Sequence, residues 1–262
     1  MVDNRDFSVM AGTAADFPPT PVVTAFPGLA GVRAFFTTRQ GGFSTGAYTS
    51  LNLGAHTGDD AHAVARNWDA VRRAHGMPFP VIPRLCHGAT LLDADDARAV
   101  AAHAGADAVF TRVRGRPLAV TTADCLAALV VDPAAGRAAA VHAGWRGTRD
   151  NILGRALTHL FAAGLCRPAS THVALGPCLS TAALELGDDI AATLPAAHVV
   201  TIAGRPHFDL RGCNRAQALT AGVPAAHIAA VGGCTRDQPG LYFSYRRDGG
   251  VTGRMAACIV LT

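Results

Sequence analysis

The segment LAVTTADCLAALVVD, residues 118–132, decides the fold. It contains two apolar runs, 118–122 and 126–132, which are separated only by the three residues ADC at 123–125. A third apolar run, AAAV, follows at 138–141. Short runs that are apolar at every position are typical of strands that are buried on both faces of a sheet. The centre of the chain is therefore predicted to form buried strands that other layers cover.

Helix and strand patterns interleave on both sides of this centre. Strands are predicted at 32–37, 81–86, 172–175, 227–231 and 257–261, and helices at 59–76, 150–164 (capped by Asp150), 188–194 and 209–221. Residues 1–28, rich in Pro, Thr and Ala, are expected to pack as an N-terminal arm. These patterns predict one mixed α/β domain that spans 1–262 without an internal linker.

Composition excludes several classes of protein. The net charge of +4 is weak, Lys and Arg are scattered, and aromatic residues make up only 6%, so a nucleic-acid partner is not predicted. No apolar stretch reaches the roughly 18 residues that a membrane span needs, and the N-terminus lacks the pattern of a signal peptide. The expected location is the cytoplasm, where the seven cysteines are expected to be free thiols and some of them candidate metal ligands.

Three predicted strands end at a reactive side chain, namely His87, Cys125 and His142. Ligands commonly bind at such strand ends. Two imidazoles and a thiolate suit zinc, and three protein ligands leave a fourth position for water or substrate. No C-x-x-C or H-x-x-x-H pairing links the three residues, so spacing alone also allows a buried cysteine and two ordinary histidines.

Other polar residues have two interpretations each. Arg39, between a strand and a Gly-Gly turn, could hold phosphate through its guanidinium or lie on the surface. Asn52 could orient a ligand or cap a turn, and Arg146 could bind an anion or anchor the end of a strand. Asp124 could orient an imidazole or accept hydrogen bonds from loop amides. The Tyr245 to Asp248 segment is interpreted as a structural ion-pair cluster.

The segments TTADCL (121–126) and VHAGWRG (141–147) resemble, nearly letter for letter, the signature of the polyphenol-oxidase (laccase)-like family. Its members are described as purine nucleoside phosphorylases and, in bacteria, as peptidoglycan-editing factors. Further motifs match in the family's order across almost the whole chain: FTTRQGGFS (36–44), SLNLG (50–54), GDD (58–60), GPC (176–178), FSYRRD (243–248) and TGRMA (252–256). The resemblance implies mixed sheets layered between helices, like the cytotoxic-necrotizing-factor catalytic domain.

The resemblance also implies a site and an activity. The family's zinc ligands correspond to His87, Cys125 and His142, with copper as a possible alternative metal. The implied activity is phosphorolysis of adenosine, inosine, guanosine or methylthioadenosine, with phosphate as co-substrate, together with deamination of adenosine. Leu85 and Cys86 stand where the family usually has Gln-Val. LST at 179–181 stands where Ile-Gly-Pro is common. The roles of Cys86, Cys178 and Glu185 therefore stay open.

Three other functions compete with this interpretation. Cys125 could be the nucleophile of a hydrolase that edits peptidoglycan precursors, with His87 or His142 as its base. The older family name suggests copper-dependent phenol oxidation, although the chain has no H-x-H arrangement. A binding module without activity would use zinc for stability and would close the site with a fourth protein ligand. The preferred nucleoside and the oligomeric state are not predicted.

Overall fold

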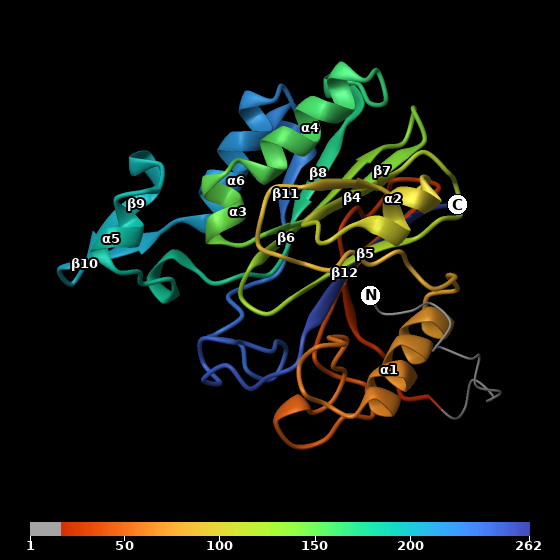
Figure 1. The fold of residues 1–262 in the computed structure, drawn as a ribbon, viewed down its shortest axis with the longest axis horizontal. Helices are drawn as coiled ribbons and strands as arrows, with labels where there is room; N and C mark the ends of the chain where they lie inside the picture. Colours follow the sequence, from red (N-terminus) through yellow and green to blue (C-terminus); the bar gives the residue numbers. More distant parts are fainter. Residues whose placement is uncertain (1–16) are drawn as a thin grey trace.

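The fold has four layers, which Figure 1 shows from one side. The computed structural model describes residues 17–262. Helix α1 (Ala61–Ala74) covers one face of a four-stranded sheet, and a six-stranded sheet packs on the other face. Helices α4 (Ile152–Ala162) and α6 (Leu210–Thr220) cover the outer face of the six-stranded sheet. The predicted α/β class, with mixed sheets between helices, is confirmed.

The four-stranded sheet is antiparallel throughout. Its strand order is β1 (Val22–Thr24), β2 (Val32–Thr37), β12 (Met255–Leu261) and β5 (Leu118–Thr122). The last strand of the chain thus lies between β2 and β5. Residues 1–16 of the expected N-terminal arm lie outside the described residues, and within the rest of that segment β1 forms an edge strand.

The six-stranded sheet is mixed. Its strand order is β11 (Ile228–Ala230), β8 (His172–Leu175), β6 (Leu126–Asp132), β7 (Arg137–Ala143), β4 (Ala108–Thr111) and β3 (Leu91–Asp93). The central pairs are antiparallel, whereas the pair at each edge, β11 with β8 and β3 with β4, is parallel. Parallel neighbours need a crossover connection, and α6 makes part of the one between β8 and β11.

The apolar runs of the centre face two different cores. On β6, Ala127, Leu129 and Val131 pack between the two sheets, while the alternate residues of β6 pack against the helices. Side chains on a strand alternate between its faces, so a strand that lies between two cores must be apolar at every position. This confirms that the central strands are buried on both faces.

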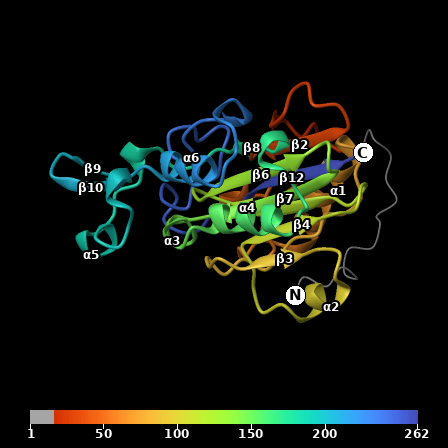
Figure 2. The same cartoon turned by 90° about the horizontal axis from the view of Figure 1, so that it is seen from above.

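Smaller elements complete the chain. They are α2 (Ala97–Ala102), α3 (Trp145–Arg149), α5 (Asp188–Ala191), β9 (Val199–Ile202) and β10 (Arg205–Phe208). Strands β9 and β10 form a separate two-stranded sheet, which projects with α5 from the body of the molecule in Figure 2. No helix in residues 17–262 has the length and hydrophobicity that crossing a membrane requires.

Two local predictions are wrong. The expected strand at 81–86 does not form, and Val81 makes only an isolated bridge to Leu118. Pro83 lacks the amide hydrogen that a strand there would use. Asp150 does not begin the 150–164 helix but caps the C-terminus of α3. The helix α4 begins after Asn151, whose φ of 61° breaks the chain direction between the two helices.

Candidate metal centre

Cys125 lies where the chain passes from one sheet to the other. Strand β5 belongs to the four-stranded sheet and β6 to the six-stranded sheet, and only residues 123–125 connect them. Asp124 turns the chain with a φ of 85°, a left-handed conformation that Asp tolerates better than most residues. The crossing is held further by the Thr122 hydroxyl, which donates to the carbonyl of Cys125. The short ADC segment therefore presents the thiol at the end of both sheets.

His142 reaches the same point from β7. It pairs with Ala127 of β6, and it lies on the face of β7 that carries Ala138 and Ala140 between the sheets. Its side chain is buried, with 3% exposed. The register of β6 and β7 thus places an imidazole beside Cys125.

His87 completes the cluster from a loop rather than from the predicted strand end. It has a φ of 58° and an exposed side chain. Its ring is perpendicular to that of His142, with 4.9 Å between the ring centroids. The ligand atoms of His87, Cys125 and His142 all lie within 4.8 Å of one another. The structure therefore brings together the three residues that the sequence singled out.

Asp107 organises this cluster, and sequence reasoning missed it. Its Oδ1 lies 2.8 Å from Nδ1 of His142 and accepts a 2.9 Å hydrogen bond from the amide of His87. Its Oδ2 accepts from the amide of Gly88 at 2.7 Å and from the thiol of Cys86 at 3.0 Å. Asp107 directly precedes the run AVFT at 108–111, whereas the predicted site residues follow such runs, so the pattern of strand ends did not point to it.

The charges of the cluster support one another. Burial alone would raise the pKa of Asp107, but hydrogen bonds from His142, Cys86 and Gly88 hold that pKa at about 2. Burial opposes ionisation of Cys125 as well, yet the imidazoles of His142 and His87 lower the pKa of its thiol. The same contacts raise the pKa of His142 against the effect of burial. The side chains thus favour a thiolate, which is the form of cysteine that binds metal.

The residues fit a zinc ion by their chemistry. A thiolate and two imidazoles are zinc ligands, and a carboxylate on the second ring nitrogen is the usual support of a metal-binding histidine. Gly144 leaves room beside them, because a Cβ at that position would lie 2.9 Å from Sγ of Cys125. Within residues 17–262 no other group of three such side chains is as close together. Neither Cys86 nor Cys178 belongs to this group, so a fourth position stays open to a non-protein ligand.

A cavity of about 1490 Å³ opens onto the three side chains. Near the cluster it is lined by Arg146, Tyr245, Arg246 and Arg254. Arg254 is close to the thiol: burial lowers the pKa of its guanidinium, while the negative charge of Cys125 raises it. Arg146 lies over the ring of Trp145, 4.3 Å from its centroid. Of the arginines here, the sequence predicted a ligand role only for Arg146.

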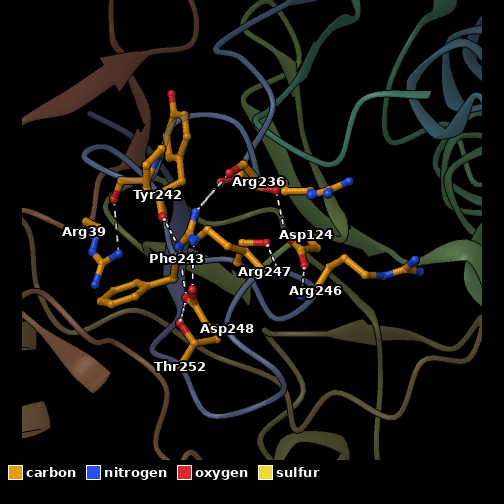
Figure 3. A network of polar contacts seen from close by, with 12 residues as sticks. Arg39, Asp124, Arg236, Tyr242, Phe243, Arg246, Arg247, Asp248 and Thr252 are labelled. Carbon is orange, nitrogen blue, oxygen red and sulfur yellow. Dashed lines mark hydrogen bonds and ion pairs between the residues drawn. The ribbon is translucent and has the colours of Figure 1, made fainter. Parts of the chain in front are cut away.

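Two other predicted site residues do not line this cavity. The guanidinium of Arg39 donates to the carbonyls of Thr49 and Pro239 and lies 4.5 Å from the centre of the Phe243 ring (Figure 3). Asn52 is fully buried, and its Oδ1 accepts from the amide of Arg254. Arg39 therefore ties two loops together, and Asn52 supports the segment that carries Arg254.

Two residues of the Tyr245 to Asp248 segment are structural, and the other two line the cavity. Arg247 and Asp248 form an ion pair at 2.7 Å, which confirms the expected structural cluster. Tyr245 and Arg246 face the cavity instead. Asp124 accepts from the Arg246 amide at 2.6 Å and from the Thr235 hydroxyl at 2.6 Å, so it satisfies a loop amide rather than an imidazole.

Glu185 lies away from the cluster. Its side chain forms an exposed ion pair with Arg205 at 3.0 Å, and its carbonyl accepts from the side chain of Arg246. Cys178 is buried beneath the cavity wall, and burial raises the pKa of its thiol to about 11. All seven cysteines are free thiols, as expected from the sequence.

The family model described as multi-copper polyphenol oxidoreductase laccase matches residues 33–262, which include all three ligands and Asp107. The chain belongs to this family. The family's description names several coppers, whereas the described part of the chain, 17–262, gathers one three-residue cluster.

Members of the family with similar sequences carry the names of purine nucleoside enzymes. Purine nucleoside phosphorylase YlmD of Geobacillus stearothermophilus is 37% identical, over 89% of this chain and 91% of its own. The purine nucleoside phosphorylase of Deinococcus radiodurans is 40% identical, over 93% and 94% of the two chains. Adenosine deaminase RL5, from an unknown prokaryotic organism, is 36% identical, over 86% and 92%.

The crystal structure of YlmD from Geobacillus stearothermophilus has the same fold. It superposes with a TM-score of 0.81 at 33% identity and covers 90% of this chain and 94% of its own. The layered arrangement that brings His87, Cys125 and His142 together is therefore shared with this relative. The names of these relatives refer to phosphorolysis and deamination of purine nucleosides. Small nucleosides are therefore the first substrates to consider.

Proposed function

We propose that this protein is a zinc-dependent purine nucleoside enzyme. It cleaves adenosine, inosine, guanosine or methylthioadenosine with phosphate, and it deaminates adenosine. The observation that carries the proposal is the open cluster of His87, Cys125 and His142, which faces a cavity large enough for a nucleoside. The names of the similar relatives supply the substrate class.

The three ligands would hold the zinc ion, and Asp107 would fix the orientation of His142. When bound, zinc supplies a Lewis acid and lowers the pKa of water toward neutrality. A carboxylate with a pKa of about 2 can only accept at neutral pH, so Nδ1 of His142 carries hydrogen and Nε2 faces the other ligands. The carboxylate thereby leaves Nε2 of His142 as the nitrogen available to a metal.

Phosphorolysis needs a group that places phosphate beneath the ribose. A phosphate oxygen attacks C1′, the bond between C1′ and the purine nitrogen breaks, and its electron pair leaves with the base, which takes up a proton. Arg254 and Arg146 are the guanidinium groups suited to hold phosphate here, because both line the cavity near Cys125. Nη1 of Arg254 donates hydrogen bonds to the carbonyls of Thr252 and Gly253. Its Nη2 has no hydrogen-bond partner within residues 17–262.

The test is incubation of the zinc-loaded protein with adenosine, with and without phosphate. Inosine reports deamination, and adenine with ribose-1-phosphate reports phosphorolysis. Both products should need zinc and should disappear in Cys125→Ala, while only phosphorolysis should need phosphate. A protein that binds one zinc ion but converts none of the four nucleosides would contradict the proposal.

A second function is favoured by one specific observation. Cys125, His142 and Asp107 also follow the order of a nucleophile, a base and the carboxylate that orients the base. The metal-free protein would then be a hydrolase of amide bonds in cell-wall precursors. Zinc on Cys125 would block this chemistry.

Alkylation separates the two functions. Iodoacetamide should react with Cys125 in the metal-free protein and spare it in the zinc form, as followed by peptide mass spectrometry. If amide hydrolysis is abolished by alkylation and inhibited by zinc, the hydrolase is correct. If nucleoside turnover rises with zinc occupancy, the nucleoside enzyme is correct.

A further inference from the structure

Four aromatic side chains line the cavity, and three of them pack against or bond to other parts of the protein. Trp68 is 2% exposed and donates from its indole nitrogen to the carbonyl of Leu53. Phe79 packs against Trp68, with ring centroids 5.6 Å apart. Trp145 is covered by the guanidinium groups of Arg146 and Arg149, 4.3 and 5.7 Å from its ring. Of these four aromatic residues, only Tyr245 is classed as exposed.

Tyr245 is unusually exposed for a large aromatic residue. Its relative exposure is 54%, and within residues 17–262 its hydroxyl has no hydrogen-bond partner. A large aromatic ring that is exposed within a cavity is suited to meet a ligand. Gly250 lies against the ring, because a Cβ added there would be 3.2 Å from Cζ and from the hydroxyl oxygen of Tyr245.

The position of Tyr245 relative to the metal cluster is fixed by the backbone. The next amide along the chain, that of Arg246, donates to Asp124 at 2.6 Å, and Asp124 directly precedes Cys125. Arg254 connects the two from the side, because its guanidinium lies 5.6 Å from the Tyr245 ring and within the electrostatic reach of the Cys125 thiol. The ring, the guanidinium and the metal ligand therefore form one side of the cavity.

We propose that Tyr245 is the positioning residue for the purine base, which stacks on the free face of its ring. This inference rests on the proposed nucleoside function and adds the surface that recognises the base. Stacking is insensitive to the substituents of a purine, so it suits a site that takes several nucleosides. The ring holds the base beside Arg254, and the ribose extends toward His87, Cys125 and His142, which line the same cavity.

The test compares Tyr245→Leu with Tyr245→Phe in the zinc-loaded protein. Because stacking on the ring is lost, the leucine variant should raise the KM for inosine about fivefold or more. Its KM for phosphate should stay within about twofold of the wild-type value, and its kcat should change much less than its KM for inosine. The phenylalanine variant keeps the ring and should behave as the wild type. Inhibition by hypoxanthine should weaken in the leucine variant by the same factor.

The possible results distinguish a failure of the role proposed for Tyr245 from a failure of the proposed nucleoside function. An unchanged KM for inosine in Tyr245→Leu, in a protein that turns over inosine normally, overturns the role of Tyr245 and leaves the proposed function intact. A leucine variant that loses kcat and phosphate affinity together also overturns it, because the residue would then be structural. Wild-type protein that neither converts inosine nor binds hypoxanthine overturns both proposals. Val251→Ala, on the same loop but outside the cavity lining and 58% exposed, serves as the control that should change nothing.

Discussion

Oδ1 of Asp107 lies 2.8 Å from Nδ1 of His142, and the same oxygen accepts the backbone hydrogen bond of His87. One buried carboxylate oxygen thus positions two of the three candidate metal ligands, one through its ring and one through its main chain. Asp107 is fully buried and precedes β4, the strand next to β7. The distance between the two imidazoles therefore depends on the pairing of β4 with β7.

Asp107→Asn should weaken zinc binding. An amide replaces the carboxylate that orients His142, and loss of such a support typically costs 10–100-fold in metal affinity. Competition with a zinc chelator measures the change. Asp96→Asn, at the exposed cap of α2, is the matched control and should bind zinc as the wild type does. Equal affinity in both variants would show that Asp107 does not support the metal.

Stability of the metal-free protein should fall in acid partly through Asp107. Its folded-state pKa of about 2 is below the ordinary value near 3.9, so its ionised form contributes stability at any pH above about 4. This contribution should decline as the pH falls from about 4 toward 2. Denaturant unfolding of wild type and Asp107→Asn should show a gap in free energy that narrows across this range. A gap that stays constant to the lowest pH at which both fold would contradict the assignment.

Gly144→Ala should close the metal site. The Cβ of the alanine would lie 2.9 Å from Sγ of Cys125 and 3.4 Å from Cδ2 of His87. The side chains of Cys125 and His87 would therefore have to move apart. The expected result is loss of stoichiometric zinc, measured by metal analysis of purified protein, and loss of activity with it. At Gly240 an added Cβ meets nothing within 4 Å, so Gly240→Ala should keep its zinc. Full zinc occupancy in Gly144→Ala would mean that the cluster is not the metal site.

Substitution of Arg254 should weaken phosphate binding, whereas substitution of Arg39 should lower the stability of the fold. Arg254→Ala should raise the KM for phosphate about tenfold or more, because it removes a charged partner from the cavity. Arg39→Ala should leave that KM unchanged but lower the melting temperature, because its bonds to the carbonyls of Thr49 and Pro239 join two loops. Steady-state kinetics and thermal unfolding of both variants test this. The reverse pattern would restore Arg39 as the phosphate ligand.

The sequence by itself indicated the buried central strands and the three candidate metal ligands. Residues 126–131 are apolar at every position because both faces of β6 are buried, and this pattern is visible within one segment. His87, Cys125 and His142 follow apolar segments, and the family motifs around Cys125 and His142 made their grouping predictable.

Only the tertiary structure decided which charged groups lie beside His87, Cys125 and His142. Asp107 reaches His142 because β4 pairs with β7, and Arg254 approaches Cys125 because β12 pairs with β5. Arg39 turns away from the cavity because distant carbonyls bind its guanidinium. A local pattern encodes which face of an element is buried. A contact between distant residues depends on strand register and on the backbone groups that compete for each side chain, which no single segment specifies.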